Sequence, residues 1–231
     1  MTSKNLDRAA LNLLSQDFEE SPLITQDIVQ RLQSNLFVSD PEFDLVFPPF
    51  YRFLSPVQWT SLNVARAIAE WIRPHQNKKF VDVGSGVGKL CLALRFWIDL
   101  EIHGVEQRPH LVAISQEIAK VNELKNIHFS AQNLIEMNWS DFDIFYLYNP
   151  FQEHVSYTDH FLIDNKIELH QKYFQDYTAR VYEELKKVKP GSMLITFHGY
   201  GGKIPKSWSL RCSQYIEGGF LSMWVKNEAR F

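Results

Sequence analysis

The sequence KFVDVGSGVGK at residues 79–89 decides the fold of this chain. Its first half is apolar and β-branched, which predicts a short buried strand that ends near Asp82. Gly84, Gly86 and Gly88 then recur at every second position and predict a turn whose backbone a ligand can approach, because no Cβ intervenes. Residues 90–97 lack Gly and Pro and are expected to form a helix whose N-terminal N–H groups point back at this turn. The stretch therefore predicts a cradle for a nucleotide-like cofactor.

The spacing of the glycines distinguishes between cofactors. The dinucleotide fingerprint G-x-G-x-x-G needs a glycine at position 89, where this chain has Lys89. The pattern D-x-G-x-G-x-G from Asp82 instead resembles motif I of the class I S-adenosylmethionine-dependent methyltransferases. That resemblance implies S-adenosylmethionine as the cofactor, with Ser85 inside its binding loop. It also implies an α/β, Rossmann-like, doubly wound seven-stranded sheet with a C-terminal antiparallel hairpin. An ordinary tight turn and an NAD-binding fold stay open as alternatives.

Composition excludes several classes of protein. The chain has 231 residues, 45% of them hydrophobic, 22% charged and 14% aromatic, which suits one cofactor-binding domain with an extension. The net charge of −3 gives no strong sign of a nucleic-acid binder. No apolar run is long enough for a membrane span. Residues 1–50 contain more acidic than basic side chains, which indicates either a region that attracts a basic substrate or simply a solvent-exposed acidic face.

Cysteine and histidine usage bears on compartment and metals. Cys91 and Cys212 lie far apart, and no N-terminal signal core is visible, so we expect a cytoplasmic protein without disulfides. Export by a specialised secretion system stays open. The eight histidines and two cysteines show no metal-ligand spacing, and the sequence therefore predicts no metal ion.

The chain is expected to divide into an N-terminal extension, residues 1–55, and a domain at residues 56–231 that contains the glycine loop. Residues 6–18 and the residues after Thr25 show helical spacing. Residues 40–54 are rich in Pro and aromatic residues without a clean period, which predicts an ordered loop that either glues the extension to the domain or covers the site. Thr60 or Ser61 is a plausible cap for the next helix.

Two further segments are expected to bind the cofactor. Residues 101–106 predict a strand that ends in Glu106, 20 residues after Gly86, the distance at which a carboxylate accepts the ribose hydroxyls. Gln107 follows it directly. Residues 126–130 predict a third strand, and Asn133 in the loop after it is preferred over Gln132 for the adenine edge, with a turn-stabilising role as the alternative.

The segment at residues 142–151 predicts the catalytic face. The strand-like run 142–148 leads into Asn149, Pro150 and Phe151, and ligands of open α/β sheets bind at such carboxyl ends. Tyr148 closes the strand. Beyond it the sequence predicts a helix at 171–187, a strand at 193–197, and a hairpin of strands at 209–216 and 220–226.

The chain from residue 56 onward resembles, within class I, the branch of the non-SET histone-lysine methyltransferases and related bacterial proteins. The resemblance rests on residues 80–89 and 104–106, and it places Trp59 and Thr60 in a segment that reaches the cofactor. It implies the following roles: Asp82, Gly84, Gly86 and Gly88 for the methionine end, Glu106 for the ribose, Asn133 for the adenine, and Asn149, Pro150 and Phe151 for motif IV. The single proline after Asn149 argues against a DNA-base or glutamine acceptor, and the absence of a basic extension argues against histone.

Three functions stay open from the sequence. The first is N-methylation of a protein lysine or another amine, in a channel lined by Tyr148, Asn149 and Phe151. The second is methylation of a small molecule or a nucleic acid, and the third is a non-catalytic cofactor-binding module. Glu153, His154 and His198 lie near strand ends, where they could relay protons or serve structural roles. The oligomeric state stays open.

Overall fold

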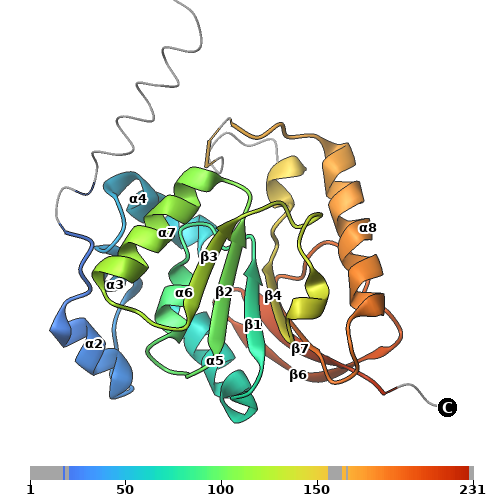
Figure 1. The fold of residues 1–231 in the computed structure, drawn as a ribbon, viewed down its shortest axis with the longest axis horizontal. Coiled ribbons are helices and arrows are strands. Elements are labelled where there is room, and N and C mark those ends of the chain that lie inside the picture. The colour runs from blue at the N-terminus through green and yellow to red at the C-terminus, as the bar shows by residue number, and fades with distance from the viewer. Residues whose placement is uncertain (1–17, 19–20, 156–162, 165, 229–231) are drawn as a thin grey trace, which may run out of the picture.

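The computed structural model describes residues 18, 21–155, 163, 164 and 166–228. Its centre is a seven-stranded sheet in the order β3-β2-β1-β4-β5-β7-β6 (Figure 1). The first five strands run parallel, and β7 pairs antiparallel with both β5 and β6. The strands are β1 Lys79–Val83, β2 Glu101–Glu106, β3 Ile127–Ala131, β4 Ile144–Tyr148, β5 Met193–Phe197, β6 Trp208–Ile216 and β7 Gly219–Lys226. The predicted fold class, with its C-terminal hairpin, is confirmed.

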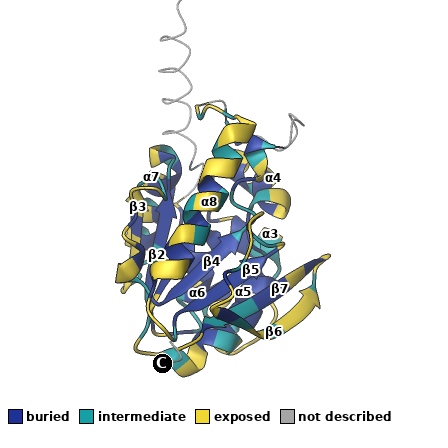
Figure 2. Ribbon diagram, turned by 90° about the vertical axis from the view of Figure 1, so that its right-hand side faces the viewer, coloured by how far each residue is buried: buried dark blue, intermediate teal, exposed yellow. Residues whose placement is uncertain are grey.

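The burial of each strand agrees with its position in the sheet. All of β5 and most of β1 and β4 are buried, as expected for central parallel strands that helices cover on both faces. Strand β6 is mainly exposed, which fits its place at the edge (Figure 2).

Helices cover both faces of the sheet (Figure 1). The helices and 3₁₀ turns from residue 62 onward are α5 Leu62–Ile72, η1 Arg73–His75, α6 Lys89–Leu94, α7 Pro109–Val121, η2 Trp139–Asp141, η3 Gln152–His154 and α8 Gln171–Lys187. Helices α5, α6 and α7 share one hydrophobic cluster with Phe80 and Ile102. Helix α8 packs on the other face, where Val181 and Leu185 meet Val81. Among the described residues, no helix is both long and apolar enough to cross a bilayer.

The segment at residues 40–54 corrects the sequence-based expectation of a loop. It forms α3 Asp40–Asp44 and most of α4 Pro49–Gln58, after α2 Gln26–Gln33. Ser39 and Glu42 make a reciprocal capping box, and Pro49 occupies the first turn of α4, where its missing N–H costs nothing. Phe43, Phe47 and Tyr51 are buried at a spacing of four residues. The prolines therefore start helices here rather than interrupt them.

A buried ion pair joins this N-terminal segment to the glycine loop. Lys89 Nζ lies 2.6 Å from Asp40 Oδ1, 2.7 Å from Asp44 Oδ1 and 2.9 Å from Ser55 Oγ. Residues of α2, α3 and α4 also belong to the hydrophobic cluster that contains α5 and α6. The described part of residues 1–55 thus packs on the domain, while the helix expected at 6–18 lies outside the described residues except for Phe18.

Candidate active site

A cavity of about 430 Å³ opens where β1, β2 and β4 end. The order of the strands reverses between β1 and β4, which is where ligands of open α/β sheets bind. Eight of the residues predicted from the sequence line it: Gly84, Glu106, Gln107, Asn133, Tyr148, Asn149, Pro150 and Phe151. The fold therefore brings segments about 65 residues apart in sequence to one cavity.

The glycine loop is hydrogen-bonded to the neighbouring strand β2. The N–H groups of Gly84 and Ser85 both donate to the carbonyl of Val105, at 2.8 and 3.1 Å. Gly86 has φ +55°, and a Cβ there would lie 2.2 Å from the Trp59 ring. Trp59 is buried and lines the cavity, and its indole N–H donates to the carbonyl of Tyr51 at 3.3 Å. Only a glycine at position 86 leaves room for the ring of Trp59, which follows α4, to pack against the loop and line the cavity.

Glu106 is a fixed, buried carboxylate at the cavity wall. The Gly86 N–H donates to Oε2 at 3.1 Å, and the Arg108 N–H donates to Oε1 at 2.9 Å. Only 5% of the residue is exposed. Each carboxylate oxygen can accept a further hydrogen bond, so the group can receive two neighbouring hydroxyls of a ligand.

Arg108 links three acidic groups beside Glu106. Its guanidinium lies 2.6 Å from Glu153 Oε2, 3.4 Å from Asp164 Oδ1 and 3.8 Å from Glu106 Oε1. Burial raises the pKa of Glu153, and Arg108 opposes that shift. Burial also acts to raise the pKa of Asp164, but the hydrogen bond from His110 and further partners hold it at about 2. The network ties the chain after β4 to the end of β2.

Asn133 and Asn149 both line the cavity, but they are held in place in different ways. Asn133 Nδ2 donates to Tyr177 Oη at 3.0 Å and to Gln107 Oε1 at 3.4 Å, while its Oδ1 accepts from Ile135 N at 3.0 Å. It therefore stabilises its turn and also faces the cavity. Asn149 has φ +39°, and its N–H donates to the carbonyl of Gly199 at 3.0 Å. This left-handed conformation lies directly after the carboxyl end of β4, where the chain borders the cavity.

Tyr148 forms an aromatic wall next to Asn149. Its hydroxyl donates to the carbonyl of Val57 at 3.4 Å, and its ring lies 5.1 Å from that of Phe197 and 5.9 Å from that of His198. Burial raises the pKa of Tyr148, so the phenol stays neutral near pH 7. Of the three residues considered as proton relays, Glu153 alone lines the cavity, whereas His154 and His198 do not.

Five predicted cofactor residues do not line the cavity: Thr60, Asp82, Ser85, Gly86 and Gly88. Thr60 shares a 2.8 Å hydrogen bond with the hydroxyl of Tyr146. Burial and the charge of Glu106 raise the pKa of Asp82 to about 8. The Ser85 hydroxyl is buried and has no hydrogen-bond partner among the described residues. The side chains of Thr60, Asp82 and Ser85 are buried outside the cavity lining.

Sequence reasoning missed much of the polar lining. Arg108 carried no distinguishing signal, because nothing in the sequence shows that Glu153 and Asp164 approach it. Tyr177 lies in the predicted helix at 171–187, and the helical pattern gives no sign that it lines the cavity. Six amide side chains line the cavity: Gln58, Gln107, Gln132, Asn133, Asn149 and Gln152. Together with two carboxylates and one paired guanidinium, they suit a neutral or cationic ligand better than a phosphate.

Comparisons with known proteins agree with this fold. The model of a family described as a methyltransferase domain matches residues 74–222. A comparison with curated protein sequences found no match.

Solved structures share the architecture at low sequence identity. TrmN from Thermus thermophilus is 14% identical with a TM-score of 0.56, over 77% of this chain and 52% of that one. YhhF from Escherichia coli is 11% identical with a TM-score of 0.52, over 71% and 85%. The magnesium protoporphyrin IX methyltransferase ChlM from Synechocystis PCC 6803 is 13% identical with a TM-score of 0.50, over 88% and 92%. Such likeness shows a common fold.

Proposed function

The chain belongs to the methyltransferase-domain family, and from this premise we propose that it methylates the amine nitrogen of a protein lysine or of another amine. Members of this family are enzymes that use S-adenosylmethionine as the methyl donor. The observation that carries the proposal is the cavity, which is lined by Asn149 and the rings of Tyr148 and Phe151 as well as by Glu106. The resemblance to the non-SET histone-lysine branch is part of this proposal.

The cavity residues fit S-adenosylmethionine. Glu106 would hold the ribose, since its buried carboxylate is fixed by two backbone N–H groups. Asn133 and Gln107 would meet the adenine. Gly84 would face the methionine end, where a Cβ would come within 3.2 Å of Pro150 and narrow the cavity. When bound, the cofactor supplies an activated sulfonium methyl group.

The five predicted residues outside the cavity lining would act on the cofactor indirectly. Gly86 and Gly88 permit the turn, with φ of +55° and +78°. The side chains of Asp82, Ser85 and Thr60 are buried, so they would set the position of the backbone that faces the ligand. Asp82 and Ser85 belong to the motif I segment, whereas Thr60 belongs to the segment ahead of the first strand.

The walls near Asn149 suit an amine acceptor. An amine attacks through its lone pair and must be neutral, and burial among aromatic and apolar groups lowers the pKa of an ammonium group. Tyr148, Pro150 and Phe151 provide such walls. The side-chain oxygen of Asn149 would accept an N–H of the amine and orient its lone pair. The residues thus contribute desolvation and alignment.

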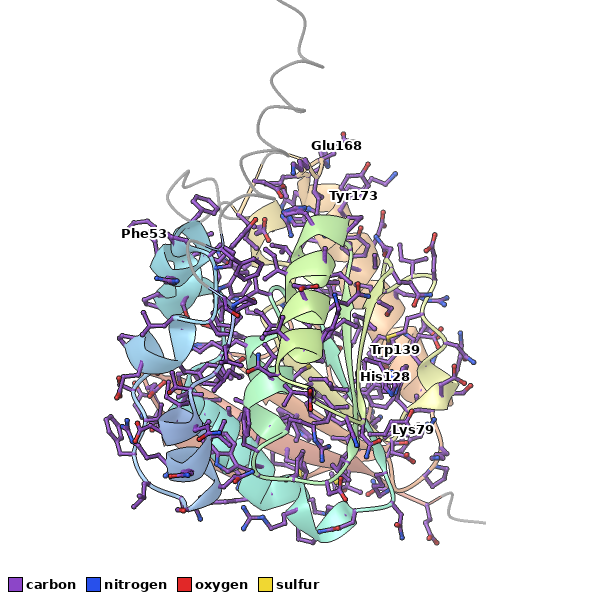
Figure 3. All side chains as sticks on the ribbon, turned by 60° about the vertical axis from the view of Figure 1, so that its left-hand side comes forward. Phe53, Lys79, His128, Trp139, Glu168 and Tyr173 are labelled. Atoms are coloured by element: carbon purple, nitrogen blue, oxygen red, sulfur yellow. The ribbon has the colours of Figure 1, made fainter. Side chains whose placement is uncertain are left out.

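The N-terminal segment would help to choose the acceptor. Val57, Gln58 and Trp59, at the end of α4, line the cavity. On the same helix Phe53 is 81% exposed, and Figure 3 labels it on the outer surface. No described residue of 1–55 lines the cavity itself, but α4 begins at Pro49 and carries Val57 and Gln58 into it, so we extend the proposal to residues 1–55 as an acceptor-selecting region ahead of the catalytic domain at 56–231.

Cofactor binding is tested by calorimetric titration with S-adenosylmethionine, S-adenosylhomocysteine and NADH. We expect the first two to bind and NADH not to bind. Glu106→Gln should weaken both affinities at least tenfold, whereas Glu70→Gln, a change at an exposed glutamate outside the cavity, should not. Equal affinities in the two variants would exclude the assigned role of Glu106.

Methyl transfer is tested with radiolabelled S-adenosylmethionine and a panel of lysine-containing proteins, small amines and RNA oligonucleotides. Asn149→Ala should slow transfer at least tenfold and keep the cofactor affinity within threefold. Label on RNA or on a small-molecule oxygen would replace the amine proposal with one of the other acceptors. Cofactor binding without transfer to any acceptor would favour a non-catalytic module.

A further inference from the structure

Three side chains of the kind that bind metal ions meet at the other end of the sheet from the cavity. They are Glu101 and His103 on β2 and His128 on β3. Glu101 begins β2 and Glu106 ends it, so about 16 Å of extended strand separates the cluster from the cavity. Figure 3 shows His128 and Lys79 well below Tyr173, which lies near the top of the molecule. The cluster therefore plays no part in the site described above.

Strand geometry brings the three residues together. Residues two apart on a strand point to the same face, which places Glu101 beside His103. The parallel register pairs His103 with His128 on the neighbouring strand. Glu101 Oε1 lies 2.8 Å from His103 Nε2, and the two imidazole centroids are 4.8 Å apart. One possible ligand atom from each residue lies within 4.8 Å of the other two.

We propose that Glu101, His103 and His128 form a binding site for a divalent transition-metal ion, with Zn²⁺ as the best match. Two imidazoles and one carboxylate are a donor set that Zn²⁺ accepts, with water in the remaining position. Bonds of about 2.1 Å to a tetrahedral ion hold ligand atoms about 3.4 Å apart. The Glu101 and His103 atoms, 2.8 Å apart, would need to separate only slightly to reach this spacing, and rotation of the exposed His128 ring would bring in the third ligand atom.

Lys79 is the group that competes for Glu101. Its ammonium lies 3.0 Å from Glu101 Oε1, but its side chain is 48% exposed. Exposed ion pairs of this kind hold their partners weakly. The ammonium can therefore withdraw into water when an ion binds. On the other side, the ring of Phe142 packs edge-on against His103 at 5.1 Å and limits where that imidazole can turn.

Such an ion would link the edge strand β3 to β2. Strand β3 lies at one edge of the sheet and pairs only with β2 among the described strands. An ion that binds the folded state but not the unfolded state raises the melting temperature of the protein. The inference does not depend on the proposed methyl transfer. It revises the expectation of no metal, which rested on sequence spacing, because His128 lies 25 residues after His103 and forms no motif with it.

The test uses the full chain after treatment with EDTA. Titration with ZnCl₂ should show one ion per chain and a rise in melting temperature, and Co²⁺ in its place should give the absorption bands of a tetrahedral site. His128→Gln and Glu101→Gln should each weaken Zn²⁺ binding at least tenfold. His75→Gln, a control at a histidine outside the cluster, should leave the affinity unchanged.

Two results would overturn the proposal. One is the absence of a one-to-one Zn²⁺ complex, which would mean that the cluster is only a hydrogen-bonded contact. The other is an unchanged affinity in His128→Gln, which would place the bound ion elsewhere. If Glu101→Gln fails to fold, His128→Gln decides the matter, because His128 is exposed. Titration of the same variants with S-adenosylmethionine should match the wild type, so failure of this proposal leaves the methyltransferase proposal standing.

Discussion

Replacing Lys89 with methionine should destabilise the fold strongly and weaken cofactor binding. The Lys89 side chain is 2% exposed and faces two carboxylates, Asp44 at 6% and Asp40 at 33%. Methionine fills a similar volume but leaves both carboxylates without their cation. Removing one partner of a buried ion pair costs about 3–5 kcal/mol. The perturbation also loosens α3 and α4, and α4 holds Trp59 against the glycine loop.

We expect a loss of about 3 kcal/mol, at the low end of that range. Burial already raises the pKa of Asp44, so this carboxyl can take up a proton once Lys89 is gone. Asp40 is partly exposed and can be hydrated. For a domain of this size, each kcal/mol lowers the melting temperature by about 2–4 °C, which predicts a drop of roughly 6–12 °C.

The assay is urea unfolding followed by circular dichroism, with calorimetric titration of S-adenosylmethionine on the same samples. Lys186→Met is the control, because Lys186 forms an exposed pair with Glu183 and should show no measurable change. Adding Asp40→Asn and Asp44→Asn to Lys89→Met should recover most of the loss, since no unpaired charge then remains. If Lys89→Met unfolds at the same urea concentration as the control, the reasoning about this buried pair is wrong.

Three further changes test other parts of the structure. Folding raises the pKa of Asp82 from 3.8 to about 8, so this group contributes stability below pH 4 that is lost as the pH rises toward 8. Asp82→Asn cannot ionise, so between pH 5 and pH 8 its free energy of unfolding should rise relative to that of the wild type by up to about 1.4 kcal/mol per pH unit. Urea unfolding of both proteins at pH 5 and pH 8 measures this change. A difference in stability that is the same at both pH values would contradict the raised pKa. Gly86→Ala should cost about 1–3 kcal/mol more than Gly191→Ala in the same assay, because only the former drives a Cβ into Trp59 although both glycines have positive φ; equal losses would mean that the ring moves freely. Lys226→Met should cost about 1–3 kcal/mol, since Lys226 Nζ donates to three carbonyls at the end of α8, and an unchanged melting temperature would show that water replaces it.

Local patterns predicted many elements correctly. The expected helix at 171–187 and the strands at 101–106 and 193–197 agree with α8, β2 and β5 to the residue. Each has a clear period or a clear boundary, such as the Pro190-Gly191 turn ahead of β5. The third strand differs by one residue, and β4 begins two residues later than expected. In these segments the local preference and the tertiary environment favour the same structure.

The segment at residues 40–54 shows where local interpretation failed. Its prolines were interpreted as loop residues, yet Pro41 and Pro49 lie in the first turns of α3 and α4. The capping pair of Ser39 and Glu42 was visible in the sequence but not used. The spacing of the aromatic residues became meaningful only against a core that buries Phe43 and Phe47 completely or nearly so. The helix-start signals of this segment are local, whereas the burial of its aromatic residues is decided by packing.

The sequence by itself determined the strand, the glycine turn and Glu106 20 residues after Gly86, because each depends on residues near in the chain. Only the tertiary structure decided which of the predicted site residues line the cavity and which do not. It alone also decided that Arg108 meets Glu153 and that Lys89 meets Asp40. The physical reason is that an ion pair depends on distance in space, and a single sequence carries no signal for charges that folding brings together from distant segments.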